Sequence, residues 1–257
     1  MKAHLYRIDC ITKMHVGSGD VNFNIIDKEV EKDPITGLPT IHASGIKGAL
    51  RDMFSGEEEG VVTYVFGNPA TKEKSTCSGA YKFFDAYMLC RPMRACNAGI
   101  LSIQVTHADI INRFIDITEQ FGCKPDFLPA KVADLNFNSN SDRFLSTVNN
   151  LHVESERTGC IVPDENIRKL LGTESYAFAE SFEGYQLPNI ARNKLDNGRS
   201  ENLWYEEFVP EGTVFYTIIC TPDDKINPLL EEKLSGIVQI GGNASIGYGF
   251  TRFTKLA

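Results

Sequence analysis

The segment G-T-V-F-Y-T-I-I-C, residues 212–220, is a continuous run of mostly apolar residues and is short enough to form one strand. Such a run is typical of a central strand that is buried on both faces of a sheet. Downstream, residues 226–234 have a helical pattern, and residues 237–253 combine I-V-Q-I, a glycine-rich segment and a last strand, F-T-R-F. The C-terminal part therefore predicts a buried strand, then a helix, then a strand at the end of the chain.

The N-terminal part has the same kinds of element in another order. Tyr6, Ile8 and Cys10 alternate with polar residues, which predicts a first strand with one apolar face. Ser44 is placed to cap a helix over residues 45–54. Strands at both ends of the chain with two helices between them favour an α+β fold with a ferredoxin-like antiparallel sheet, rather than a repeat or a doubly wound fold.

Between these ends, the pattern is less regular. Residues 80–89 and 100–105 are strand-like. A helix is expected from a capping-box-like start at Thr106 to a stop at Gly122. Residues 190–208, around a D-N-G turn, are typical of a projecting hairpin.

The domain organisation is predicted as one domain over residues 1–257 with two insertions. The first insertion covers about 55–78, which carries an acidic run and a cluster of turn residues. The second covers about 124–184, which shows no clean period over its first part. With 257 residues the chain is long enough for one sizeable core.

Composition indicates a folded, water-soluble domain, with 42% hydrophobic and 23% charged residues. The formal net charge of −8 argues against a protein that binds bare duplex DNA or a membrane surface. There is no apolar stretch of ~18 residues and no apolar signal core near the N-terminus, so we expect a cytoplasmic protein with no membrane partner. Seven cysteines without a C-x-x-C pair predict reduced thiols.

Several common chemistries are excluded or disfavoured by missing motifs. The glycines near the C-terminus do not open a helix inside a βαβ unit, which excludes a dinucleotide fingerprint. The chain has no G-x-x-x-x-G-K-[ST], which disfavours a P-loop ATPase. Its five histidines show no H-E-x-x-H or H-x-H spacing, so a zinc hydrolase is not expected.

Three groups of residues remain as candidates for binding or catalysis. Lys47 and Arg51 lie four apart on a helical face, where Ser44 and the helix N-terminus could meet the same phosphate; the alternative is a pair of solvent-facing charges. The glycines Gly241 and Gly242 either form tight turns beside an edge strand or expose backbone N–H groups to a phosphodiester.

The third group lies at the exit of the first strand. Asp27 follows Ile25 and Ile26 in an otherwise polar loop, which would give its carboxylate an apolar flank, and His15 faces the same connection. The alternatives are a solvated loop acid and a structural histidine. The other acids of this loop, including Asp33, are expected to be solvated charges.

Three motifs in this order resemble the RAMP superfamily of CRISPR-associated proteins: H-V-G-S-G at 15–19, D-P-I-T-G-L-P-T-I-H-A-S-G-I-K-G-A-L-R at 33–51, and I-G-G-N-A-S-I-G-Y-G at 240–249. Within it, L-P-N-I-A-R-N at 187–193 and L-W-Y-E-E-F-V-P-E-G-T at 203–213 are most similar to the backbone subunit of the type III-B, or Cmr, effector complex. The middle of the chain has no match.

The resemblance implies an RRM-like core with a thumb hairpin at about 187–208, and several copies stacked along a CRISPR guide RNA. It implies that Lys47 and Arg51, with Ser44 beside them, contact guide phosphates. Arg192 belongs to a basic patch on the thumb, and the loop with Gly241 and Gly242 would support RNA binding or the adjacent subunit. Other Cmr-complex subunits and a single-stranded target RNA are the further partners expected.

The resemblance also implies an activity, which is guide-dependent cleavage of complementary single-stranded RNA. Asp27 matches the family's cleavage residue and His15 its histidine before the glycine turn. Asp27 would act as a base or hold Mg²⁺ or another divalent cation by oxygen coordination. One carboxylate is too few for a two-metal nuclease, so slow cutting is expected.

The sequence leaves three alternatives open. The first is a non-catalytic structural subunit with the same RNA contacts. The second is a guide-processing endoribonuclease of the same superfamily, which uses histidine acid–base chemistry without metal. The third is the related type III-A backbone subunit, which differs mainly in the thumb. A small-molecule enzyme is disfavoured because no cofactor motif supports it.

Overall fold

The structure is a computed structural model, and it describes residues 1–17, 26–68, 76–96, 100–132, 151–153, 157–161, 164–179, 186–222 and 225–257. Four strands form the centre of the main sheet, in the order β15-β1-β13-β6, with every neighbouring pair antiparallel. These strands are β1 (Lys2–Cys10), β6 (Ala86–Cys96), β13 (Val214–Thr221) and β15 (Phe250–Lys255).

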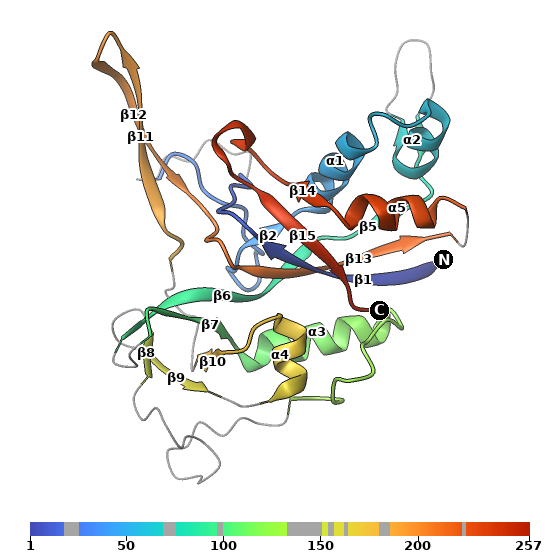
Figure 1. The fold of residues 1–257 in the computed structure, drawn as a ribbon, viewed down its shortest axis with the longest axis horizontal. Coiled ribbons are helices and arrows are strands. Elements are labelled where there is room, and N and C mark those ends of the chain that lie inside the picture. The colour runs from blue at the N-terminus through green and yellow to red at the C-terminus, as the bar shows by residue number, and fades with distance from the viewer. Residues whose placement is uncertain are drawn as a thin grey trace.

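Two helices connect these strands in the ferredoxin-like manner. Helix α1 (Ala43–Met53) lies between β1 and β6 along the chain, and α5 (Asn227–Leu234) lies between β13 and β15. Both helices lie on the same side of the sheet in Figure 1. The α+β, ferredoxin-like core expected from the two ends of the chain is thereby confirmed.

The opposite face of the sheet is covered by α3 (Ala108–Gln120), which carries a buried apolar stripe (Figure 1). The Phe114 ring of α3 makes an edge contact with Tyr216 of β13, with 4.7 Å between the ring centroids. The guanidinium of Arg113 lies 4.4 Å from the centroid of the Tyr87 ring on β6. Because helices cover both faces, β13 is buried along nearly its whole length, as its apolar run predicts.

The sheet continues beyond β6 into the middle of the chain. Strand β7 (Ser102–Thr106) pairs antiparallel with β6 and parallel with β10 (Tyr176–Ala179). Beyond β10 lie β9 (Arg157–Ile161) and β8 (Leu151–Val153), and α4 (Glu165–Leu171) packs beside them. The described part of the region expected as the second insertion thus contributes strands to the main sheet.

Short elements complete the described fold. They are β2 (Thr40–Ile41), β5 (Lys82–Phe83), β14 (Ile237–Gln239), the small pair β3 (Gly67–Asn68) and β4 (Cys77–Ser78), α2 (Glu59–Phe66) and the 3₁₀ turn at Ala244–Ile246. Helix α2 buries Val65 and Phe66 in the core, so part of the expected surface insertion at 55–78 is core structure. Residues 69–75 of that prediction lie outside the described residues.

The predicted hairpin is present as a separate two-stranded sheet, β11 (Asn189–Asp196) and β12 (Arg199–Glu207), which projects away from the main sheet in Figure 1. Asn197 and Gly198 form its turn with φ values of 48° and 79°, a backbone shape that favours these two residue types. Most of its side chains are exposed.

Two helix starts differ from the prediction. Helix α1 begins at Ala43, so Ser44 lies inside its first turn and is not the cap; Asp85 from the β5–β6 connection accepts a hydrogen bond from the Ala43 N–H at 2.6 Å. Helix α3 is capped by His107, whose ring accepts from the Asp109 N–H. A local sequence pattern cannot show a hydrogen-bond cap that comes from a distant segment.

None of the helices in the described ranges has the length and apolarity to cross a membrane.

Candidate functional site

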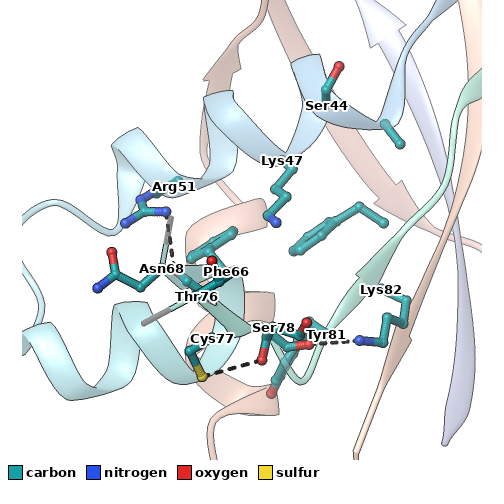
Figure 2. A pocket seen from close by; sticks show the side chains of 14 residues that line it. Ser44, Lys47, Arg51, Phe66, Asn68, Thr76, Cys77, Ser78, Tyr81 and Lys82 are labelled. Carbon is teal, nitrogen blue, oxygen red and sulfur yellow. Dashed lines mark hydrogen bonds between the residues drawn. The ribbon is translucent and has the colours of Figure 1, made fainter. Parts of the chain in front are cut away.

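A cationic pocket, which we call the α1 pocket, lies between α1 and the β3–β4 pair, with a cavity volume of about 660 Å³. Three cations line it, Lys47 and Arg51 from α1 and Lys82 from β5, while no Asp or Glu does so among the described residues. Figure 2 shows Lys47 pointing from α1 toward β3 and β4. In a protein of net charge −8, this cluster is a local positive site suited to a phosphate.

The pocket walls hold two of these cations in place. Arg51 donates from Nη1 to the Gly67 carbonyl at 3.2 Å, and Lys82 donates from Nζ to the Gly79 carbonyl at 2.7 Å (Figure 2). Neither partner is an anion, so both side chains keep their full charge for a ligand. Ser44 lines the same pocket one turn before Lys47. The structure therefore brings Ser44, Lys47 and Arg51 together and adds Lys82.

Asp27 lies elsewhere, at the base of the hairpin. Its side chain is exposed, and its Oδ2 accepts a hydrogen bond from the Tyr205 N–H of β12 at 2.8 Å. Lys28 continues the contact, donating its N–H to the Tyr205 carbonyl at 3.1 Å and accepting from the Glu207 N–H at 2.9 Å. The carboxylate of Asp27 thus takes the place of a strand carbonyl beside β12, and in the described part of the chain no hydrogen bond to its Oδ1 is formed.

His15 is a structural part of the same region. Its side chain is 9% exposed, and its Nδ1 lies 2.7 Å from the Glu207 carbonyl oxygen. Since a carbonyl only accepts, Nδ1 carries the proton in this contact. The ring therefore fixes the end of β12 against the chain that follows β1.

The glycine-rich loop packs directly on His15. The Gly242 N–H donates to the His15 carbonyl at 2.9 Å. A Cβ on Gly241 would lie 2.3 Å from the same carbonyl oxygen, and the φ of Gly241 is +85°. Gly241 is thus required for the close approach of two loops, and the Gly242 N–H is used inside the protein.

Arg192 is also engaged in contacts within the protein. Its Nε lies 3.1 Å from Oε2 of Glu206, a carboxylate that is 1% exposed. Asn243 of the glycine-rich loop donates to the other oxygen of Glu206, and the Arg192 guanidinium lies 5.1 Å from the centroid of the Tyr248 ring. This network joins both hairpin strands to the glycine-rich loop.

The predicted residues therefore form two groups. Ser44, Lys47 and Arg51 line the α1 pocket; the others gather at the base of the hairpin, namely His15, Asp27, Arg192, Gly241 and Gly242. Sequence reasoning missed Lys82 in the first group and both buried carboxylates of E-E, Glu206 and Glu207, in the second. The only signal for the latter pair was its position at the end of the hairpin.

A divalent cation needs several oxygen ligands. Within the described ranges, no three His, Cys, Asp or Glu side chains come together as a metal site. Asp27 offers a single carboxylate, one oxygen of which is engaged by Tyr205. These residues do not form a resident metal site by themselves.

The ferredoxin-like sheet, the projecting hairpin and the α1 pocket together indicate the family to which the chain belongs. A family model described as the RAMP superfamily matches residues 7–252, and the chain belongs to that family. Among curated proteins, the chain is 28% identical over 292 residues to the CRISPR system Cmr endoribonuclease Cmr4 of Pyrococcus furiosus, with 99% of this chain and 96% of that protein covered.

Solved structures show the same fold. The chain matches a type III-B Cmr-beta subunit from a complex bound to cognate target RNA, with a TM-score of 0.71 and 20% identity over 100% of this chain and 98% of the other. It also matches the crystal structure of oligomeric Cmr4 from Pyrococcus furiosus, with a TM-score of 0.65 and 22% identity over 100% and 99% of the two chains. The resemblance to the type III-B backbone subunit is confirmed.

Proposed function

We propose that this protein is a backbone subunit of a type III-B CRISPR ribonucleoprotein, which binds guide RNA and cleaves complementary single-stranded RNA. The observation that carries the cleavage step is the placement of Asp27. Its carboxylate is exposed, yet it is held by a 2.8 Å hydrogen bond to the base of a projecting hairpin. The relative named Cmr endoribonuclease supports an RNA-cleaving activity.

The α1 pocket is the proposed contact for the guide. Its three cations and the hydroxyl of Ser44 match the phosphodiester backbone, which is read by charge and not by base. The other partners would be further copies of the chain, other Cmr subunits and the target RNA. An oligomeric relative and a relative in a complex with target RNA support these partners.

The proposed reaction uses the target's own 2′-OH. Where the hairpin kinks the target, the 2′-oxygen attacks the adjacent phosphorus in line, and the 5′-oxygen leaves. Asp27 Oδ1 takes the 2′-OH proton, and water supplies a proton to the departing 5′-oxygen. A divalent cation, expected from the resemblance, would neutralise phosphate charge and would need RNA and water oxygens beside Asp27.

The guide-processing alternative is not supported at His15, the histidine that the sequence points to. That chemistry requires a histidine that reaches RNA. The ring of His15 is buried, with Nδ1 on the Glu207 carbonyl. Isolated protein that cuts a CRISPR repeat hairpin in EDTA would favour this alternative.

The test compares Asp27→Asn with wild type in complexes reconstituted with the operon partners and a guide RNA. The asparagine amide oxygen can still accept from Tyr205, so the hairpin contact is kept. We expect single-turnover cleavage of labelled target to fall by about 100-fold or more, with target affinity within about two-fold. Asp196→Asn, an exposed acid at the hairpin turn, is the matched control and should cleave normally.

Wild-type cleavage by an assembled Asp27→Asn complex would overturn the catalytic proposal and leave a structural subunit. Reactions with Mg²⁺, with EDTA and with EDTA followed by Mg²⁺ test the cation. Cleavage that persists at full rate in EDTA would contradict the metal dependence.

A further inference from the structure

The last two residues of β12 both carry buried carboxylates: Glu206 is 1% exposed and Glu207 is 2% exposed. Consecutive side chains of a strand point to opposite faces. Glu206 accordingly meets Arg192 and Asn243, whereas Glu207 turns toward the residues after Asp27. The two acids are equally buried but have different partners.

Glu207 holds residues 26–32, which we call the Asp27 segment, through both carboxylate oxygens. Oε2 accepts from the Val30 N–H at 3.0 Å, and Oε1 lies 3.0 Å from Nζ of Lys32. The Glu207 N–H also donates to the Lys28 carbonyl at 2.9 Å. One residue of the hairpin thus contacts three residues within five positions of Asp27.

These contacts decide where Asp27 lies. The carboxylate of Asp27 is exposed, and among the described residues its hydrogen-bond donor is the Tyr205 N–H, so its position also depends on how the chain that follows it is held. A buried carboxylate needs its hydrogen bonds, and so does the N–H of Val30, a residue that is 2% exposed. If the carboxylate contacts of Glu207 fail, the Val30 N–H loses its partner, and the Asp27 segment must shift around Val30 although its backbone bonds through Lys28 remain.

We propose that Glu207 is a positioning residue for Asp27. Its carboxylate binds the Asp27 segment to the hairpin base and so determines the position and orientation of Asp27 Oδ1. This inference rests on the proposed cleavage by Asp27. Displacement of a reacting group by about 1 Å can cost about 100-fold in rate. Target binding, which this contact does not touch, should be unaffected.

The test uses isosteric variants in the reconstituted complex: Glu207→Gln, Lys32→Met and the two combined. In Glu207→Gln, the amide can face Val30 or Lys32 correctly but not both, since its NH₂ group opposes the other donor. We expect single-turnover cleavage to fall about ten-fold or more, with target affinity within about two-fold. Amide exchange at Val30 should become faster.

In the double variant, Lys32 no longer competes for the side-chain amide at position 207, so the amide oxygen can accept from the Val30 N–H alone. The double variant should therefore cleave within about three-fold of wild type, which is a non-additive rescue. Glu119→Gln is the control, because it changes a carboxylate that also pairs with a lysine, Lys124, but lies on α3, outside both groups of candidate residues. It should cleave within about two-fold of wild type.

Asp27→Asn in the same assay separates this inference from the proposed function. If Asp27→Asn loses cleavage while Glu207→Gln keeps the wild-type rate, the positioning role is wrong and the proposed function stands. Equal losses in Glu119→Gln and Glu207→Gln, or a double variant no faster than Glu207→Gln, would also overturn the assignment. Full cleavage by Asp27→Asn would refute the proposed function itself.

Discussion

Arg192 and Glu206 form an ion pair diagonally across the two strands of the hairpin, with 3.1 Å between Nε and Oε2 and with the carboxylate almost completely buried. The charge of Arg192 is thereby neutralised inside the protein. The cations of the α1 pocket contact carbonyl groups instead. Two basic patches that look alike in the sequence therefore have different electrostatic roles.

The first prediction concerns the salt dependence of guide RNA binding. Lys47→Ala and Lys82→Ala should each lower the slope of log affinity against log salt concentration by about 0.7, because each removes one phosphate contact to a single strand. Arg192→Gln should leave the slope unchanged but lower the free energy of unfolding by about 1–3 kcal/mol, since Glu206 loses its cation. Fluorescence anisotropy in a KCl series and urea unfolding measure the two effects. An unchanged slope in both lysine variants would contradict the pocket assignment.

The second prediction concerns the glycine-rich loop. Gly241→Ala should destabilise the protein by about 1–3 kcal/mol, because its Cβ would meet the His15 carbonyl and its φ of +85° suits glycine. Gly242→Ala is the control, with its Cβ at 4.0 Å from the same oxygen. Urea unfolding of both variants measures the difference. Equal stability of the two would show that the loop can move away without cost.

The third prediction uses a thiol as a reporter of the pocket. Cys77 is exposed and lines the α1 pocket, whereas burial raises the pKa of the Cys10 and Cys90 thiols and, to about 11, that of Cys123. Iodoacetamide should therefore modify Cys77 before these three, and bound guide RNA should slow its modification. Peptide mass spectrometry follows each site. Labelling of Cys77 at the same rate with saturating guide would place the RNA elsewhere.

The fourth prediction concerns acid stability. Asp33 is 6% exposed and pairs with Arg113 at 3.1 Å, so the expectation of a solvated loop acid was wrong. Burial alone would raise the pKa of Asp33, but hydrogen bonds from Arg113 and Thr36 and the charge of Arg113 together hold it below its ordinary value of 3.8. The stabilisation is thus complete above the pKa of the unfolded chain and is lost as pH falls through the folded pKa.

Asp33→Asn should be less stable than wild type near neutral pH by about 1–3 kcal/mol, and the gap should narrow below about pH 4. Urea unfolding between pH 3 and pH 7 measures this, with the exposed acid variant Asp126→Asn as control. A gap that is constant over the whole range would show that ionisation of Asp33 is not the cause.

Local periodicity predicted the parts of the fold that bury one face against the central sheet. The apolar spacing in α1 and the run in β13 are both direct consequences of what these elements pack against. The parallel pairing of β10 with β7 was not predictable in this way, because it joins segments about 70 residues apart and leaves no local pattern. The same holds for the cap that Asp85 gives to α1.

The candidate site likewise contains residues that a local sequence pattern predicts and residues that it does not. Lys47 and Arg51 could be paired from their helical spacing, while Lys82 enters the pocket from a strand about 30 residues away. Glu206 and Glu207 are typical surface residues by type. Their burial follows from the hairpin strand running into the core, where Arg192 and Lys32 come from other segments to neutralise them.

The covering of the sheet by α3 has a consequence for how nucleic acid can be bound. Tyr87 and Tyr216 lie on the face that α3 occupies, where Arg113 lies over the Tyr87 ring and Phe114 makes an edge contact with Tyr216. Tyr216 is thereby buried and Tyr87 partly covered, so these two rings are not free platforms for stacking on a base. In the proposed function, the sheet would instead set the distance between two separate RNA contacts, the α1 pocket and the hairpin base.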